Sequence, residues 1–192
     1  SYTVVVKNGA GDQGTASTAF VTTIDTVAPA VALTAATDDV GSVTGALTSG
    51  STTDDTVLAL SGTNEAGATV NVYNGATLLG AAIVTGTTWT YSAVVANGTT
   101  YAFNAKATDV AGNTSAATAN FAVTGDTVAP AAPTIAAADD VGSVTGSFVS
   151  GNTTDDTALV LSGTNEAGAT VNVYNGATLL GTANVVGTTW SY

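Results

Sequence analysis

The chain has 192 residues and a formal net charge of −12 at pH 7, because 14 acidic side chains face only two basic ones. Such a polyanion is not suited to hold DNA or RNA, whose phosphates require a basic surface. Histidine, cysteine and methionine are all missing from the sequence. A disulfide framework is therefore excluded, and zinc, copper and iron–sulfur sites are disfavoured because they use thiolate or imidazole ligands.

The apolar content points to a β-sandwich. Hydrophobic residues make up 45% of the chain, but only 6% of the residues are aromatic and the excess is alanine and valine. A thin core of small and β-branched side chains is typical of sandwiches. The sequence contains no run of 18 apolar residues, so no membrane span is predicted, and no signal-peptide pattern precedes Ser1. We interpret the chain as an interior part of a longer one.

A repeat of 101 residues organises the sequence. Residues 25–91 and 126–192 are identical at 52 of 67 aligned positions, without a gap. A period of this length defines units of about a hundred residues, which is the size of one domain. The sequence is therefore interpreted as a tandem array of related domains.

The first 24 residues match residues 102–125 at the same offset, mainly through spacing. Ala10-Gly11-Asp12 aligns with Ala111-Gly112-Asn113, and Phe20 aligns with Phe121. We interpret residues 1–24 as the last two strands, F and G, of a preceding and more divergent repeat.

Residues 25–125 form the complete repeat. Short alternating segments separated by turn residues recur about every ten positions, which indicates an all-β domain. Asn74-Gly75 between two apolar runs predicts a tight hairpin turn, because both central residues of such a turn need positive φ. The seven predicted strands, A to G, span residues 30–34, 56–63, 68–73, 76–84, 87–95, 101–108 and 117–124.

Residues 126–192 repeat strands A to E and lack F and G. A sandwich without these two strands would expose sheet edges and half of its core. Because residues 1–24 correspond to strands F and G, two hypotheses follow. Either copies associate head to tail, with residues 1–24 of one completing residues 126–192 of the next, or the chain is an excerpt of a longer array.

The acidic residues lie outside the predicted strands, in the linkers and loops. Adjacent like charges repel, so paired aspartates are tolerated more easily with a counter-ion. Calcium prefers six to eight oxygen ligands from carboxylates, amides and backbone carbonyls, which these loops offer. The predicted calcium ligands are Asp25, Asp38, Asp39, Asp54, Asp55, Glu65, Asp109 and Asn113 in the complete repeat, and Asp126, Asp139, Asp140, Asp155, Asp156 and Glu166 in the next one.

Topology divides these residues between two poles. In a seven-strand sandwich the A–B loop lies at the far pole, while the linker and the B–C and F–G loops lie at the near pole. We therefore expect the A–B aspartates of one repeat to meet Asp126 and Glu166 of the next and to share calcium at the junction. The alternative is that each aspartate forms a turn or only adds solubility.

The aromatic residues are interpreted as core residues rather than as a platform for binding sugars: Tyr73, Trp89, Tyr91, Phe103 and Phe121.

Five motifs together resemble the bacterial Ig-like extender repeats of giant, biofilm-associated, RTX-type adhesins. They are Asp25-Thr26-Val27-Ala28-Pro29, Asp38-Asp39-Val40-Gly41-Ser42-Val43-Thr44-Gly45, Thr53-Asp54-Asp55-Thr56, Leu60-Ser61-Gly62-Thr63 and Ala107-Thr108-Asp109-Val110-Ala111-Gly112-Asn113. The resemblance implies tandem Ig-like Greek-key β-sandwiches, a location outside the cell or on the bacterial surface, and calcium at or near domain junctions. Residues 1–24 depart from the pattern, since Asn8 takes the place of Asp109 and Asp12 that of Asn113.

The leading functional hypothesis is a structural extender that supports cell adhesion and biofilm formation. Its partners would be neighbouring repeats and other copies head to tail, without nucleic acid or membrane insertion. The alternatives are a self-assembling filament subunit and a calcium-dependent module that binds a glycan or another surface. We expect no enzymatic activity, because histidine and cysteine are missing and no loop sets acids beside an apolar pocket.

Overall fold

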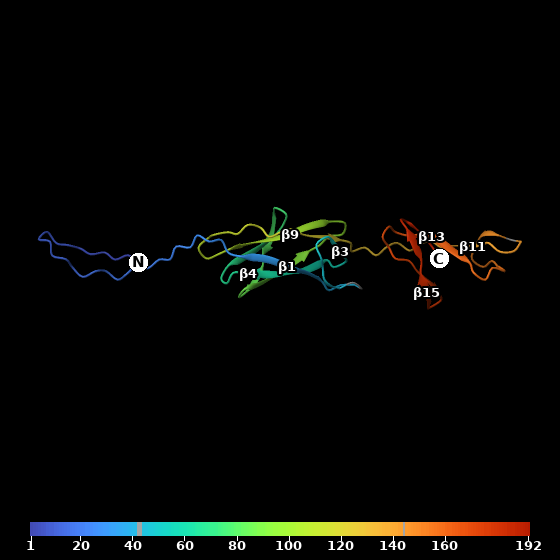
Figure 1. The fold of residues 1–192 in the computed structure, drawn as a ribbon, viewed down its shortest axis with the longest axis horizontal. Helices are drawn as coiled ribbons and strands as arrows, with labels where there is room; N and C mark the ends of the chain where they lie inside the picture. The colour runs from blue at the N-terminus through green and yellow to red at the C-terminus, as the bar shows by residue number, and fades with distance from the viewer. Residues whose placement is uncertain (42–43, 144) are drawn as a thin grey trace. The chain divides into compact units, whose positions relative to one another are not determined.

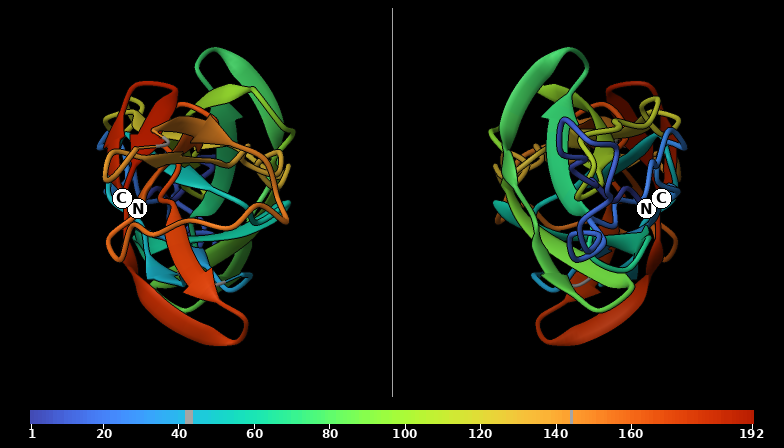
Figure 2. Two further views of the ribbon diagram at one scale, coloured as in Figure 1. Left: turned by 90° about the vertical axis from the view of Figure 1, so that its right-hand side faces the viewer. Right: turned by 90° about the vertical axis from the view of Figure 1, so that its left-hand side faces the viewer.

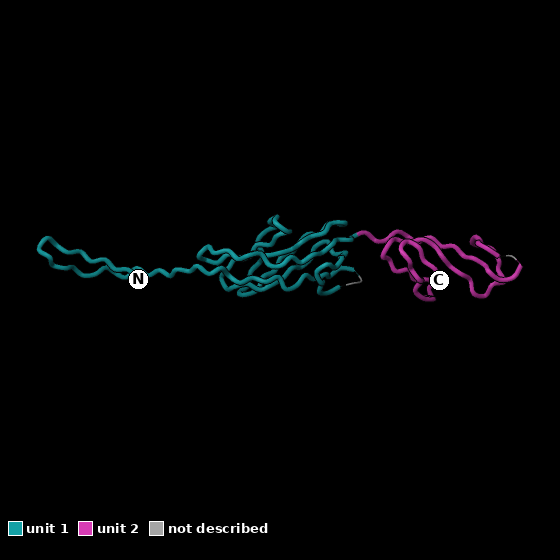
Figure 3. Tube along the Cα trace, turned by 45° about the horizontal axis from the view of Figure 1, so that its top comes forward, with its two compact units in different colours: residues 1–127 teal, residues 128–192 magenta. Residues whose placement is uncertain are grey.

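The computed structural model describes residues 1–41, 44–143 and 145–192, so Ser42 and Val43 of the quoted motif lie outside the described residues. The chain divides into two compact units, residues 1–127 and 128–192 (Figure 3). In the part of the chain that is described, every regular element is a β-strand (Figures 1 and 2).

Unit 1 contains a ten-stranded sandwich in its residues 31–125. Its strands are β1 (Val31–Asp38), β2 (Gly45–Ala46), β3 (Ser51–Thr53), β4 (Val57–Asn64), β5 (Thr69–Asn74), β6 (Thr77–Ala81), β7 (Ile83–Thr85), β8 (Thr88–Val94), β9 (Thr100–Thr108) and β10 (Phe121–Gly125).

Two five-stranded sheets form this sandwich, in the orders β2-β1-β4-β8-β7 and β3-β10-β9-β5-β6. Neighbouring strands are antiparallel, except that β3 runs parallel to β10. The strands expected as A, B and E share one sheet with part of D, and those expected as C, F and G share the other, which is the arrangement of an immunoglobulin-like sandwich. The expected fold class is therefore confirmed.

The core of unit 1 lies between the two sheets, as the alternation of apolar residues requires. Along β4, Leu58 and Leu60 are fully buried while Val57 and Ala59 are exposed. They belong to one core cluster with Trp89 of the neighbouring strand β8 and Phe103 of β9 in the facing sheet. The Nε1 of Trp89 donates a hydrogen bond to the carbonyl of Ala32 at 3.1 Å, which satisfies the polar edge of the largest buried ring.

Two details of the strand predictions were wrong. The single strand expected over residues 76–84 is split, because β6 belongs to one sheet and β7 to the other. The chain changes sheets at Ala82, whose N–H donates to the carbonyl of Val70 at 2.8 Å. The strand expected over residues 30–34 continues to Asp38, which means that an acidic residue does end a strand, and Asp139 does so in unit 2.

The assignment of Tyr73 to the core was also wrong. Its neighbours Val70 and Val72 face the core, whereas Tyr73 is half-buried and carries the Nζ of Lys106 5.2 Å above its ring centroid. Tyr101 takes the expected place in the core instead. It stacks on Phe103, and its hydroxyl accepts a hydrogen bond from the Ala96 N–H at 3.0 Å.

In the described residues of unit 2, the first sheet has the same order as in unit 1 and the second sheet consists of two strands. The sheets have the orders β12-β11-β13-β17-β16 and β14-β15. The strands are β11 (Ala136–Asp139), β12 (Gly146–Phe148), β13 (Val160–Thr164), β14 (Asn172–Asn175), β15 (Thr178–Thr182), β16 (Asn184–Val186) and β17 (Thr189–Ser191).

Residues 1–24 form an antiparallel hairpin. Tyr2 pairs with Phe20, and Lys7 pairs with Gln13. Their counterparts at the 101-residue offset pair in the same way, since Phe103 lies opposite Phe121 and a bridge joins residues 108 and 114. The hairpin therefore has the register of β9 and β10.

Candidate metal centre

Two buried aspartates lie where the segment after β3 meets the end of β1. Asp38 is 3% exposed and Asp55 is 2% exposed. The hydroxyl of Thr53, itself buried, donates to Asp38 Oδ2 at 2.6 Å and accepts the Asp55 N–H at 3.2 Å. Asp38 Oδ1 accepts the N–H of Val40, and Asp55 Oδ1 accepts that of Val57. Both carboxylates are therefore held in place by the backbone and by one threonine.

One oxygen of this group has no hydrogen-bond partner. Asp55 Oδ2 is buried and accepts no hydrogen bond within the described residues. An anionic oxygen in this position loses its hydration without compensation, which is costly for the folded state. Lys106 is the one basic residue of the complete repeat, and it lies over the ring of Tyr73, where β9 pairs with β5. A cation supplied from solution would offset this cost.

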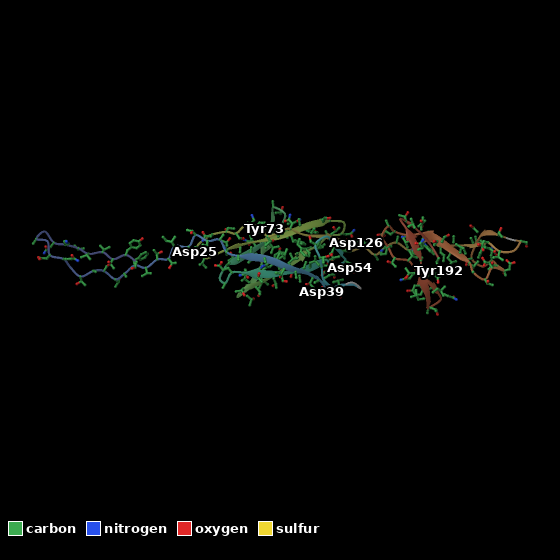
Figure 4. The ribbon with its side chains drawn as sticks, viewed as in Figure 1. Asp25, Asp39, Asp54, Tyr73, Asp126 and Tyr192 are labelled. Atoms are coloured by element: carbon green, nitrogen blue, oxygen red, sulfur yellow. The ribbon has the colours of Figure 1, made fainter. Side chains whose placement is uncertain are left out.

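Two further acidic residues border the pair. The exposed carboxylate of Asp54 lies against Gly41, where an added Cβ would collide with it, and Gly41 has a φ of +75°. The Asp126 N–H donates to the carbonyl of Thr53 at 2.8 Å. We call Asp38, Asp54, Asp55 and Asp126 the far-end cluster. In unit 1 the side chains of Asp39, Asp54 and Asp126 lie at one end and Asp25 at the other (Figure 4).

Unit 2 repeats the buried pair in its own residues. Asp139 is 8% exposed and Asp156 is 9% exposed. Thr154 Oγ1 donates to Asp139 Oδ2 at 2.5 Å and accepts the Asp156 N–H at 3.0 Å, while Asp156 Oδ2 has no partner among the described residues. Asp155 lies against Gly142 as Asp54 lies against Gly41. The same arrangement has therefore formed twice.

An open hollow adjoins the pair of unit 2. It has a volume of about 290 Å³ and is lined by Asp139, Ser143, Thr153, Thr154 and Asp155. Its oxygen-rich lining matches the ligands of a hard cation. Asp140 is exposed, as is its counterpart Asp39.

The predicted ligands at the opposite end of unit 1 form a separate loop. Asp109 Oδ1 accepts the N–H groups of Ala111 and Asn113, each at 2.9 Å, and Asn113 Nδ2 donates to Asp109 Oδ2 at 2.8 Å. These hydrogen bonds hold the pKa of Asp109 below its ordinary value, and the bond from the Asn113 side chain has the largest effect. Burial acts in the opposite direction. Asn113 Nδ2 also lies 3.2 Å from the carbonyl of Asp25. Asp109 is thus satisfied by the protein itself.

Among the described residues, the carboxylates of the remaining predicted ligands Asp25, Glu65 and Glu166 form no hydrogen bond with either group, and Asp25 meets the Asp109 loop only through its backbone carbonyl. Asp25 Oδ1 accepts the Val27 N–H at 3.0 Å and forms a turn. Glu65 and Glu166 are exposed, and their backbone carbonyls accept the side-chain amides of Asn64 and Asn165.

The hairpin turn of residues 1–24 carries Asn8 and Asp12 where the complete repeat carries Asp109 and Asn113, and the turn forms in both. Asn8 Oδ1 accepts the N–H groups of Ala10 and Asp12, and Asn8 Nδ2 donates to Asp12 Oδ2 at 3.0 Å. Donor and acceptor have changed places relative to residues 109 and 113, because the carboxylate and the amide are similar in size and shape. This explains how the departure from the motif is accommodated.

The residues of the far-end cluster fit calcium in their chemistry but do not form a complete coordination sphere. Among the residues that the structure describes, no group of three or more histidine, cysteine, aspartate or glutamate side chains is arranged to hold a metal ion. Asp38, Asp55 and Asp54 supply hard oxygens, and Asp55 Oδ2 is unpartnered. The other ligands of a six- to eight-coordinate ion would have to be water, hydroxyl and backbone oxygens.

Sequence reasoning missed Thr53 and its counterpart Thr154, which connect the two buried aspartates in each unit. A signal was present in the alternation of side chains. Asp38 follows the buried Ala36 by two residues, and Asp55 follows the buried Thr53 by two residues. In a strand, residues two apart lie on the same face. The pattern therefore marks Asp38, the last residue of β1, as inward-facing, whereas Asp55 lies beyond the end of β3 and has no such signal.

Comparison with known proteins places this fold in a family. The sequence model of a bacterial Ig-like domain matches residues 29–127, which is more than half of the chain. Chitinase A1 of Niallia circulans is 44% identical over 128 residues, which cover 62% of this chain and 16% of that protein. No solved structure matches. In the described ranges no helix has the length and apolar character to cross a membrane. With its sandwich topology and this match, the chain belongs to the bacterial Ig-like domain family.

Proposed function

We propose that this chain is a structural extender segment of a large bacterial surface adhesin, located outside the cell and supporting adhesion and biofilm formation. Membership of the bacterial Ig-like family supports this proposal, as does the tandem repeat. The acidic loops recur almost unchanged between the repeats. A binding module would be expected to carry one unusual loop, whereas a spacer needs none. In this proposal the repeats have no catalytic activity.

Calcium at the far-end cluster would stiffen the array. The observation that carries this part is the buried, unpartnered carboxylate oxygen of Asp55, which occurs again at Asp156. Asp126 is the first residue after β10, where the chain leaves the sandwich of unit 1. An ion bound by Asp38 and Asp55 together with Asp126 would connect the start of this linker to the sandwich.

The expected stabilisation is a sizeable part of the stability of one domain. Extracellular modules bind calcium with a Kd of about 10⁻⁴ to 10⁻³ M. At a free concentration of about 100 times Kd, linkage stabilises the folded state by about 2.7 kcal/mol, and at about ten times Kd by roughly half of that. Native proteins have a total stability of about 5 to 15 kcal/mol.

Thermal unfolding with and without calcium tests the proposal. Millimolar calcium should raise the Tm of the 192-residue chain, and a chelator should reverse the increase. Asp55→Asn should remove the part of the calcium-dependent shift that belongs to unit 1, because the unpartnered anionic oxygen is lost. Asp39→Asn is the matched control, since this aspartate is exposed although it directly follows Asp38 in the chain, and it should keep the full shift. Equal Tm values in calcium and chelator would contradict a role for calcium.

A second candidate rests on the match to chitinase A1. That protein is named as a chitinase, and the matched segment is 16% of it. The present repeats could therefore separate the domains of a secreted polysaccharide-degrading enzyme. The coding sequence on both sides of this segment distinguishes the two candidates. Further copies of the repeat would support the adhesin, and a flanking glycoside hydrolase domain would support the enzyme.

A further inference from the structure

We propose that the side of the sandwich formed by β6 and β7 is a self-association surface, at which a second copy of this chain pairs its own β6 edge to edge. We call residues 76–87, which contain both strands, the neutral flank. This inference concerns side-by-side contact between copies and does not depend on the adhesin or calcium proposals. Three observations on the sandwich of unit 1 carry it: an open strand edge, the absence of charge along that edge, and the apolar side chains exposed on it.

The neutral flank is one narrow side of the sandwich of unit 1. β6 is the last strand of one sheet and β7 is the last strand of the other. Figure 2 shows the hairpin of β5 and β6, in green, at the margin of unit 1. Among the described residues, β6 pairs only with β5 and β7 pairs only with β8. Each strand therefore has one edge without a strand partner, and such an edge can accept a further strand.

The side of the molecule that carries this edge is uncharged. Residues 66–105, which include β5 to β8, contain no charged side chain and no proline. Charges, proline and bulges are the usual protections of an open edge, and the neutral flank has only an irregular register at Leu79. On the opposite flank, Asp38 lies opposite Gly45 of β2, and Asp54 directly follows β3. Carboxylates therefore lie beside one pair of edge strands and not beside the other.

Apolar side chains are exposed along the neutral flank. Leu78, Leu79 and Ile83 are 55%, 37% and 73% exposed. Unit 2 repeats the pair of leucines at the same offset in its edge strand β15, where Leu179 and Leu180 are 54% and 48% exposed. Burial of such side chains against a partner would remove apolar surface from water. The flank thus offers apolar contacts as well as backbone hydrogen bonds.

These features fit a second copy of the same chain. Two β6 edges in antiparallel orientation present the same row of donors and acceptors to each other, which gives a two-fold contact between identical patches. A net charge of −12 makes copies repel. In unit 1, however, Asp39, Asp54 and Asp126 lie at one end and Asp25 at the other (Figure 4). Two neutral flanks can meet without bringing charges together, whereas a basic partner would be drawn to the acidic ends.

Sedimentation of the 192-residue chain tests the association. The mass should rise above the monomer value of 18.5 kDa as the protein concentration increases. Added sodium chloride should strengthen the association, because it screens the repulsion between the acidic copies. Leu78→Asp combined with Leu179→Asp should raise the dissociation constant by about tenfold or more, because each contact would then hold unpaired charges.

A second double variant is the matched control. Ala59→Asp combined with Val160→Asp adds the same charge at exposed positions of β4 and β13, the central strands of their sheets. It should change the dissociation constant by no more than about twofold, as for other exposed substitutions. Equal effects of the two double variants would place the association on another surface and would overturn the proposal, as would a monomer at all concentrations.

Disulfide cross-linking tests whether β6 itself forms the contact, and the chain has no native cysteine to interfere. Directly opposite Cβ atoms of paired strands lie about 4.5 to 5.5 Å apart, which is close to the separation that a disulfide needs. Chains with one cysteine in β6, alone or mixed in pairs, should give disulfide-linked dimers in at least one combination of Thr77→Cys, Leu79→Cys and Ala81→Cys. Ala59→Cys should give far fewer dimers. Equal cross-linking from β6 and from position 59 would contradict pairing at this edge.

Discussion

Thr53 connects the acidic residues at the far end of unit 1. Its hydroxyl donates to Asp38 and accepts from the Asp55 N–H, and its carbonyl accepts from the Asp126 N–H. Hydrogen bonds to a charged group contribute more than those between neutral groups. The threonine therefore connects the carboxylate of Asp38 to the backbone of Asp55 and Asp126.

Thr53→Val tests this role, because valine has almost the same shape and lacks the hydroxyl. The substitution should lower the free energy of unfolding by about 1.5 to 3 kcal/mol, the contribution of a hydrogen bond to a charged group. Urea unfolding in chelator measures it without interference from calcium. Thr52→Val, at the exposed neighbouring position in β3, should change stability by no more than about 0.5 kcal/mol. Equal effects of both substitutions would contradict the role.

At the scale of the elements, the turn after β9 shows how a loop can use an aspartate without a metal. Asp109 and Asn113 close the turn through three hydrogen bonds to Asp109. Asn8 and Asp12 close the equivalent turn with the roles exchanged. A pair of one carboxylate and one amide is therefore sufficient for this loop.

The same turn predicts a dependence of stability on pH. The pKa of Asp109 in the folded chain is below 3.8, mainly because the Asn113 side chain donates to it. The unfolded chain binds the proton first as the pH falls, so this contribution is present above the unfolded pKa and is lost as the pH falls through the folded pKa. Asp109→Asn should therefore lose less stability on acidification below pH 3.8 than the unaltered chain. Urea unfolding across this range measures it, and identical pH profiles would refute the assignment.

For the whole molecule, the proposed stiffening concerns the segment that leaves the sandwich of unit 1 after β10. Its first residues are already bound to the sandwich. The Asp126 N–H donates to Thr53, and the Thr127 N–H donates to Asn97 Oδ1 at 2.9 Å. Calcium at the far-end cluster would add to this attachment and would oppose the mutual repulsion of four carboxylates.

Small-angle scattering at low protein concentration tests the stiffening. Calcium should give a longer maximum dimension than chelator at constant mass, because a fixed linker keeps the units extended. The double variant Asp38→Asn with Asp55→Asn should give in calcium the profile that the unaltered chain gives in chelator. A profile that is the same in calcium and chelator would leave the extender without its proposed mechanism.

The all-β class, the period of 101 residues and most of the strands could be predicted from the sequence, because they depend on local signals. Alternation of apolar residues along β4 is one example, and the hairpin between β5 and β6 is another. The expected central residues of that hairpin turn were wrong by one position, since Asn74 pairs with Thr77 and the turn consists of Gly75, with positive φ, and Ala76. The sequence also predicted loop positions for most of the acidic residues, because turn-forming residues surround them. The same reasoning could not place Tyr73, whose side depends on an irregular register between Val72 and Tyr73.

Only the tertiary structure decided which of the acids share a site. Asp38 and Asp39 are adjacent and chemically identical, yet the first is buried against Thr53 and the second is exposed. Asp38 faces Thr53 of β3, and the parallel pairing of β3 with β10 holds that threonine in place. Pairing between segments so far apart has no local signature, because it depends on closure of the whole sandwich. Composition and period determined what kind of domain this is, and long-range strand pairing determined where its charges are buried.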